Sequence, residues 1–258
     1  MAAPTPPPLT ADLEHGLKRL KLRAIRQLAP EVLATAKTQR WAPQELLRTL
    51  VEAEIAARDA ANLANRLRSA SFPVVKTIEQ FQLSASSIPA PTFDYLASLE
   101  WIDATENVVL VGPPGTGKSH VLIALGHAAV HAGLRVRYLT AAELVERLFS
   151  GLADNTVGRT IDTLLRHHYV ILDELGFAPL DPTGSQLLFR FIAAAYEGRA
   201  IGLASHHPFE NWGRFLPEQT TATAMLDRLL HHAIVVTTDG ESFRMREAKT
   251  RTSNRRKT

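Results

Sequence analysis

The 258-residue chain contains no cysteine. This absence excludes disulfide bridges and thiolate metal sites, and it fits a reducing compartment. The chain also lacks an apolar run of about 18 residues, the length that a membrane-spanning helix needs. Its first residues, MAAPTPPPLTA, lack the basic segment and the apolar segment of a secretory signal. From these absences we expect a soluble cytoplasmic protein with no membrane partner.

Basic residues are concentrated towards the two ends of the chain. Residues 1–72 carry 11 Lys/Arg and 7 Asp/Glu, and residues 244–258 carry 7 Lys/Arg and one acid. Residues 73–243 carry 11 Lys/Arg against 18 Asp/Glu. This pattern favours a polyanion as the partner of the ends, while basic tails that serve only solubility remain the alternative.

The N-terminal part of the chain predicts a small all-helical domain. Residues 1–11, rich in Pro and Ala, are expected to form a disordered arm. Apolar residues at helical spacing predict helices over residues 12–72, with Pro30 and Pro43 in the first turns of successive helices. One long helix is expected over residues 44–68, and its apolar side consists of Leu46, Leu47, Leu50, Val51 and Ile55.

The composition changes after residue 72. Residues 73–92 hold prolines and a serine cluster and are expected to be a connector, residues 93–245 a nucleotide-binding domain, and residues 246–258 a basic tail. Within residues 93–245 apolar strands alternate with helices, which predicts a parallel sheet flanked by helices. The expected strands are 107–112, 135–139, 169–174, 200–205 and 233–237, and Thr140 with Glu143 forms a capping box before a helix.

A glycine-rich loop carries the most specific motif. The segment GPPGTGKS matches G-x-x-x-x-G-K-[ST] and lies between a predicted strand and a predicted helix. Such a loop turns backbone N–H groups towards phosphate oxygens. We expect Lys118 to contact the β- and γ-phosphates of ATP and Ser119 to offer its hydroxyl to Mg²⁺. The expected nucleotide-binding residues are Gly112, Pro113, Pro114, Gly115, Thr116, Gly117, Lys118, Ser119 and His120.

Two acidic residues end the predicted strand 169–174. Asp173 would lie beside the loop, where its carboxylate can hold Mg²⁺. Glu174 is predicted to orient and polarise the water that attacks the γ-phosphate. The alternative is that this acidic pair merely ends a strand.

Several segments resemble one family, the AAA+ ATPases of the IstB type. These are helper proteins of insertion-sequence transposases and are similar to DnaC-type helicase loaders. The resemblance covers most of residues 13–247, and the N-terminal segments narrow it beyond a general nucleotide-binding motif. The segments are LKRLKL (17–22), EAEIAARD (52–59), RLRSASFPVVKTIEQF (66–81), LEWIDATENVVLVG (99–112), GPPGTGKSH (112–120), RYLTAAELVERL (137–148), YVILDELGF (169–177), ASHHPFENWGRF (204–215) and DRLLHHA (227–233).

The resemblance implies an α/β fold, an AAA+ P-loop NTPase with a parallel sheet flanked by helices, preceded by the small all-helical domain. It implies that Arg228 is an arginine finger offered to the nucleotide of a neighbouring subunit, although a surface ion pair is the alternative. It also implies that Arg244 is a second sensor, with Arg246 as its rival.

Histidine stands at one position where the family pattern has another residue. The first sensor is usually Asn after Ser, but here His206 follows Ser205, so its protonation can vary near neutral pH. Other histidines occur as adjacent pairs, 167–168 and 231–232. His127 and His131 have no acidic third ligand in register and are expected to be residues of a helix face.

The expected function follows from the resemblance and from the charge pattern. The chain is predicted to be a bacterial ATPase that oligomerises on duplex DNA in its ATP state, remodels the DNA and recruits a partner transposase. A replicative helicase loader, a small-molecule kinase and a non-hydrolysing switch remain alternatives. The expected DNA contacts are Lys18, Arg19, Lys21, Arg23, Lys249, Arg251, Arg255, Arg256 and Lys257.

Overall fold

The structure, a computed structural model, describes residues 6–243 and residue 245. The chain divides into two compact units, one up to Asn65 and one from Arg66 onwards. This division falls inside a helix, whereas the sequence composition changes only after residue 72. Residues 1–5 of the expected arm and the expected tail 246–258 lie outside the described residues. Among the described residues, no helix is both long and apolar enough to cross a membrane.

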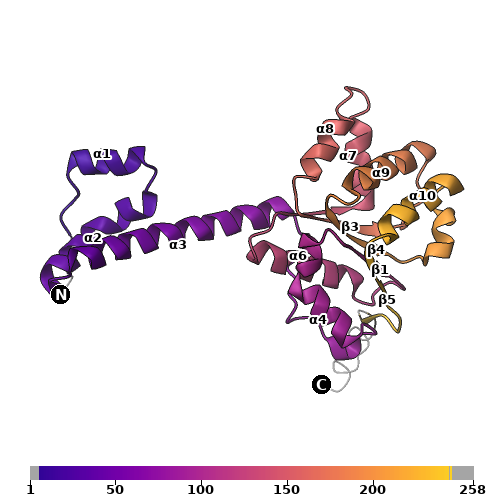
Figure 1. The fold of residues 1–258 in the computed structure, drawn as a ribbon, viewed down its shortest axis with the longest axis horizontal. Coiled ribbons are helices and arrows are strands. Elements are labelled where there is room, and N and C mark those ends of the chain that lie inside the picture. Colours follow the sequence, from indigo (N-terminus) through magenta and orange to yellow (C-terminus); the bar gives the residue numbers. More distant parts are fainter. Residues whose placement is uncertain (1–5, 244, 246–258) are drawn as a thin grey trace, which may run out of the picture. The chain divides into compact units, whose positions relative to one another are not determined.

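The described part of the first unit consists of three helices: α1 (Ala11–Arg19), α2 (Arg23–Gln39) and α3 (Pro43–Ala70), the last of which extends into the second unit (Figure 1). Pro43 is the first residue of α3, as predicted. The prediction that Pro30 begins a helix is wrong, because Pro30 lies inside α2. The start of α2 is instead fixed by a distant side chain.

That side chain is Glu54 of α3. Its carboxylate accepts hydrogen bonds from the N–H groups of Ala24 (2.8 Å) and Ile25 (3.2 Å), and from Arg58 Nε at 2.9 Å. These N–H groups lie in the first turn of α2 and have no partner within the helix. Burial works to raise the pKa of Glu54, but the hydrogen bonds from Arg58 and from the helix start outweigh it and keep that pKa below its ordinary value. Glu54 therefore caps α2.

The apolar side of α3 is only partly covered, since Leu46 and Leu50 are half-buried and the other three residues are exposed. Leu47, Val51 and Ile55 are 63%, 41% and 54% exposed, and Leu20 in the turn after α1 is 67% exposed. Only Ala29 and Ala36 of α2 are buried. The first unit therefore presents much of its apolar surface to solvent.

The second unit is built on a five-stranded sheet in which every pairing is parallel. The strands lie in the order β2-β3-β4-β1-β5, so β4 separates β1 from β3. All five predicted strands are present, with ends shifted by a residue or less. Their bounds are β1 Asn107–Val111, β2 Val136–Thr140, β3 Tyr169–Leu175, β4 Ala200–Ser205 and β5 Ala233–Thr237.

Helices cover both faces of this sheet, as Figure 1 shows. One face packs against α6 (Lys118–His131), with α4 (Ala90–Ser98) and the short α5 (Glu100–Asp103) on the same side. Side chains such as Val109, Leu172 and Leu203 point to the other face and form the main core. That core is closed by α7 (Ala141–Ser150), α8 (Val157–Leu164), α9 (Pro182–Ala195) and α10 (Gln219–Leu230). The predicted α/β fold is confirmed.

Two local features position the elements around the site. The predicted capping box of α7 is present, since Thr140 accepts from the N–H of Glu143 and Glu143 accepts from the N–H of Thr140. Short 3-10 helices occur at Leu83–Ala85 and Phe209–Arg214. Because all strands are parallel, their carboxyl ends meet at one edge, where ligands bind in open α/β sheets.

Candidate nucleotide site

The glycine-rich loop joins β1 to α6 at this edge, as predicted. Gly112, Gly115 and Gly117 have φ angles of 146°, 81° and 97°, which side chains rarely tolerate. A Cβ at Gly112 would lie 2.0 Å from the carbonyl oxygen of Thr238, and one at Gly117 would lie 2.9 Å from the ring of Phe81. The loop therefore requires glycine for its backbone angles and for the close approach of neighbouring segments.

Lys118 is the first residue of α6 and is buried. Its ammonium donates hydrogen bonds to the carbonyl oxygens of Gly112 (2.6 Å) and Pro113 (2.7 Å). The charge is thus held inside the loop, where the phosphates of a nucleotide are expected. A helix N-terminus at the same place adds partial positive charge.

The two predicted magnesium ligands are brought together. Ser119 Oγ donates a hydrogen bond of 3.0 Å to Asp173 Oδ1, although 54 residues separate them in the chain. Ser119 is exposed, while Asp173 is buried. A hydroxyl and a carboxylate form the all-oxygen donor set that Mg²⁺ prefers. These residues therefore fit the ion that nucleotide phosphates carry.

Tyr138 is a residue of the site that the sequence did not suggest. From β2, its hydroxyl donates a hydrogen bond of 2.9 Å to Asp173 Oδ2, the oxygen that Ser119 leaves unused. Burial raises the pKa of Tyr138, and the negative charge of Asp173 raises it further. The phenol therefore stays protonated and remains a donor. Register between β2 and β3 pairs Thr140 with Asp173, and no local sequence pattern reveals this contact.

Replacing Tyr138 with phenylalanine should increase the Mg²⁺ concentration that the nucleotide site requires. Without the phenol, one oxygen of a buried carboxylate loses its donor, and a hydrogen bond to a charged group contributes about 1.5 kcal/mol or more. We expect the Mg²⁺ concentration for half-maximal binding of a fluorescent ATP analogue to rise about tenfold, with the melting temperature monitored in parallel. Tyr95→Phe is the matched control, because that phenol bonds Glu106 instead. An unchanged Mg²⁺ requirement would contradict a positioning role for Tyr138.

Glu174 has an unusual backbone that redirects its side chain. Its φ is 59°, in the left-handed region, and the pairing of β3 with β4 shifts register between Leu172 and Leu175. Such irregularities at a strand end re-aim side chains and occur near active sites. Asp173 is buried, whereas Glu174 is exposed. The neighbouring acids therefore face different environments, and Glu174 is accessible to water.

His206 follows β4, the strand between β1 and β3, so topology places it between the glycine-rich loop and the acidic pair. Burial lowers the pKa of His206, and the nearby His207 and Lys118 lower it further. Its neutral form is therefore favoured at neutral pH, which reduces the variation of protonation expected from the sequence. A neutral imidazole still offers one donor and one acceptor.

Arg228 lies at the opposite edge of the sheet, where the amino ends of the strands meet. It is in the last turn of α10, and the chain after α10 enters the beginning of β5. Its guanidinium donates to the carbonyl of Ala224 (2.9 Å) and stacks 5.1 Å from the ring of Phe189. Five residues of strand, roughly 16 Å at about 3.3 Å each, separate the two edges. The chain does not bring Arg228 to its own glycine-rich loop.

The segment after β5 returns to the loop. Thr238 Oγ1 lies 2.7 Å from Thr116 Oγ1, and the N–H of Phe243 donates to the carbonyl of Gly115 at 3.0 Å. The predicted second sensor, Arg244, and its rival Arg246 are next in the chain but lie outside the described residues. So do the predicted DNA contacts Lys249, Arg251, Arg255, Arg256 and Lys257.

The other predicted DNA contacts are exposed. Lys18 and Arg19 end α1, Lys21 lies in the turn, and Arg23 begins α2. Arg58 of α3 joins this group, since its guanidinium donates to the carbonyl of Lys21 at 3.4 Å. The sequence did not suggest Arg58, which is 37 residues away from Lys21.

Taken together, the sheet order, the loop after β1 and the acids near the carboxyl end of β3 define a P-loop nucleotide-binding protein of the AAA+ class. Solved structures have the same fold. A replication initiator DnaA bound to AMPPCP and single-stranded DNA matches with a TM-score of 0.51 and 20% identity, covering 64% of this chain and 50% of that one. DnaI matches with a TM-score of 0.54 and 15% identity, covering 64% of this chain and 91% of that one.

Sequence comparison narrows this class to a family. The chain belongs to the IstB-like ATP binding protein family, whose model matches residues 15–251. A putative ATP-binding protein of insertion sequence IS21 from Pseudomonas aeruginosa is 35% identical over 239 residues, which are 92% of this chain and 90% of that protein. Another, of IS5376 from Geobacillus stearothermophilus, is 34% identical over 232 residues, 90% of this chain and 92% of that protein. The resemblance seen in the sequence is confirmed.

Proposed function

We propose that this protein is an ATPase that assembles on duplex DNA when ATP is bound and recruits a partner transposase for the movement of an insertion sequence. Membership of a family whose relatives are encoded in insertion sequences supports the transposition role. The observation that carries the mechanism is that the glycine-rich loop and Arg228 lie at opposite edges of one sheet. A complete hydrolytic site therefore needs a second copy of the chain.

Hydrolysis is assigned to the residues at the carboxyl edge. The loop and Lys118 bind and orient the phosphates, and Ser119 with Asp173 would hold Mg²⁺, which neutralises phosphate charge when bound. Glu174, exposed beside buried Asp173, polarises the attacking water and accepts its proton. His206 contacts this water or the γ-phosphate as a neutral group. A kinase excludes water from this position, so Glu174 favours hydrolysis over transfer to a metabolite.

Assembly is assigned to two features. Arg228 completes the site of the neighbouring copy, where it stabilises the charge that develops during hydrolysis. The first unit adds an exposed apolar surface with Leu47, Val51 and Ile55, which suits contacts with other chains. DNA binding is assigned to the exposed cations at the turn between α1 and α2, which contact phosphates without reading bases.

DNA binding should depend on the nucleotide. With a non-hydrolysable ATP analogue, we expect the chain to bind a fluorescent duplex at least tenfold more tightly than without it, measured by anisotropy, because each neighbour adds its cations to the same duplex. Raising the salt concentration should weaken this binding steeply. Lys118→Ala, which removes the phosphate contact, should abolish the effect of the analogue. Equal affinity with and without the analogue would refute nucleotide-driven assembly.

The same assay tests the assigned contacts. A double variant, Lys18→Ala with Arg19→Ala, should lower affinity and reduce the salt dependence, because two phosphate contacts are lost. Lys37→Ala is the matched control, since Lys37 is exposed on α2 outside the group of cations at the turn between α1 and α2.

Recruitment of the transposase is tested separately. We expect the transposase to be captured on DNA only when this chain and ATP are both present.

A further inference from the structure

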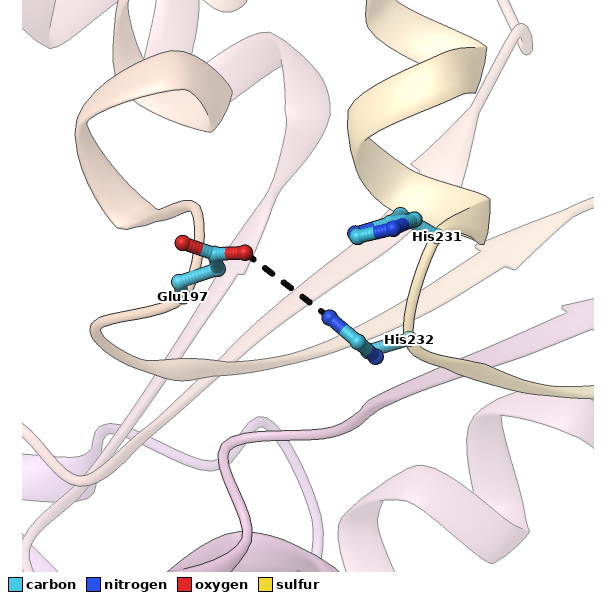
Figure 2. A group of neighbouring side chains, drawn as sticks. All are labelled: Glu197, His231 and His232. Carbon is cyan, nitrogen blue, oxygen red and sulfur yellow. Dashed lines mark ion pairs between the residues drawn. The ribbon is translucent and has the colours of Figure 1, made fainter.

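A second cluster of ligand-type side chains lies far from the nucleotide loop, at the opposite edge of the sheet. Glu197 follows α9, and His231 with His232 links α10 to β5 (Figure 2). One carboxylate oxygen and one ring nitrogen of each histidine lie within 4.8 Å of one another. Among the residues that the structure describes, no other group of three His, Asp or Glu side chains meets this criterion.

The distances within the cluster suit an ion better than a direct bond. His232 Nε2 and Glu197 Oε1 are 3.8 Å apart, which is too long for a hydrogen bond. Tetrahedral zinc binds nitrogen and oxygen at about 2.0–2.2 Å, which separates two ligands by about 3.3–3.6 Å. Small side-chain rotations are therefore enough to place both atoms around one ion. All three residues are exposed, so an ion can enter from solvent.

His231 is oriented by a neighbouring side chain. Its Nδ1 lies 2.8 Å from the hydroxyl of Tyr196, the residue before Glu197. When Nδ1 carries the proton and donates it to the phenol oxygen, Nε2 keeps its lone pair for a metal. A polar partner on the second ring nitrogen is the usual arrangement for a histidine that binds metal.

The backbone that carries the cluster is fixed by Asn107, a buried residue at the start of β1. Its N–H donates to the carbonyl of His232 (2.7 Å), and its side chain donates to the carbonyl of Leu229 (3.0 Å) and accepts from the N–H of Ile201 (3.0 Å). The ends of α10, β1 and β4 are thus tied together. Ligands on such fixed backbones lose little entropy when they bind an ion.

The local field also favours a cation. Both α9 and α10 end at this place, and the carbonyl ends of helices carry partial negative charge. Glu197 adds a full negative charge. Imidazole nitrogens select first-row transition metals rather than Mg²⁺, which prefers oxygen ligands.

We propose that Glu197, His231 and His232 bind one Zn²⁺ ion, with water at the remaining position. Three protein ligands with water at the fourth position are the arrangement found in zinc sites that keep an open position. The ion joins the end of α9 to the end of α10, one turn from Arg228. Zinc therefore fixes the helix that presents Arg228, a role that goes beyond the proposed ATPase and DNA-binding functions.

The test is direct titration of the full, untagged and EDTA-stripped chain with zinc sulfate, in the presence of excess Mg²⁺ and without nucleotide. Calorimetry should give one site per chain, and zinc should raise the melting temperature because it binds the folded state. Cobalt should bind at the same site and give the visible absorption of a tetrahedral ion. None of these readouts depends on ATP hydrolysis, so the result is independent of the proposed function.

Variants locate the site. Because the three side chains are exposed, Glu197→Gln, His231→Gln and His232→Gln should fold normally, and each should weaken zinc binding at least tenfold. His131→Gln is the matched control, an exposed histidine on α6 without an acidic partner in the cluster. Zinc affinity that is unchanged in the His231→Gln, His232→Gln double variant would overturn the proposal, as would the absence of saturable binding to the unmodified chain.

Discussion

Arg228→Ala is expected to lower the rate of ATP hydrolysis on DNA by about 10³- to 10⁵-fold, the range that an arginine finger contributes. The affinity of a single chain for ATP should stay the same, because Arg228 lies at the edge of the sheet away from its own glycine-rich loop. Phosphate release measures the rate of ATP hydrolysis. Binding of a fluorescent ATP analogue at low protein concentration measures the affinity of a single chain for ATP. Arg190→Ala is the control, since Arg190 is an exposed arginine of α9.

A mixing experiment separates action in the neighbouring copy from a loss of folding. Lys118→Ala chains lack the phosphate contact but keep Arg228, whereas Arg228→Ala chains keep the loop. Each preparation alone should be inactive, and the mixture should recover a fraction of the activity, since some sites pair an intact loop with an intact arginine. If the mixture stays as inactive as its components while Arg228→Ala chains still bind ATP and recruit Lys118→Ala chains to the same DNA, Arg228 does not act across subunits.

Glu174→Gln should retain ATP and fail to hydrolyse it. Removal of a general base typically costs about 10²- to 10⁴-fold in rate, while the amide preserves the size of the side chain and the left-handed backbone at this position. Single-turnover phosphate release measures the loss. Because ATP is not consumed, the variant should also remain on duplex DNA longer than the unmodified chain, which competition with unlabelled DNA reveals.

The matched control for this variant is Glu146→Gln, an exposed acid in the middle of α7. It should hydrolyse ATP at the normal rate. A Glu174→Gln chain that hydrolyses ATP within twofold of the control would show that another group activates the water. His206 would then be the next residue to replace.

Much of the fold could be predicted because its determinants are local. Buried strands such as 169–174 are short apolar runs, and the capping box at Thr140 involves residues three positions apart. The loop from Gly112 to Ser119 is recognised from the spacing of its glycine, lysine and serine residues. The sheet order could not be predicted from these patterns, since the insertion of β4 between β1 and β3 depends on how all strands pack together.

The side-chain contacts that the sequence analysis did not predict all join residues far apart in the chain. Glu54 caps α2 through the N–H of Ala24, 30 residues earlier in the chain, and Pro30 lies inside that helix rather than at its start. Tyr138 meets Asp173 across two neighbouring strands, and Glu197 meets His231 only after α9 and α10 have packed. The spacing of residues in a sequence carries no information about such pairs. Paired histidines at 231 and 232 were visible, but their acidic partner was not.

The opposite placement of the glycine-rich loop and Arg228 gives each chain two dissimilar ends. Surfaces of this kind join head to tail, and such joining continues in one direction unless it closes into a ring. In the proposed assembly, an open row would therefore always contain one fewer completed catalytic site than it has members. The chain at one terminus of such a row would be expected to keep its ATP unhydrolysed, and disassembly of the row would be expected to have a direction.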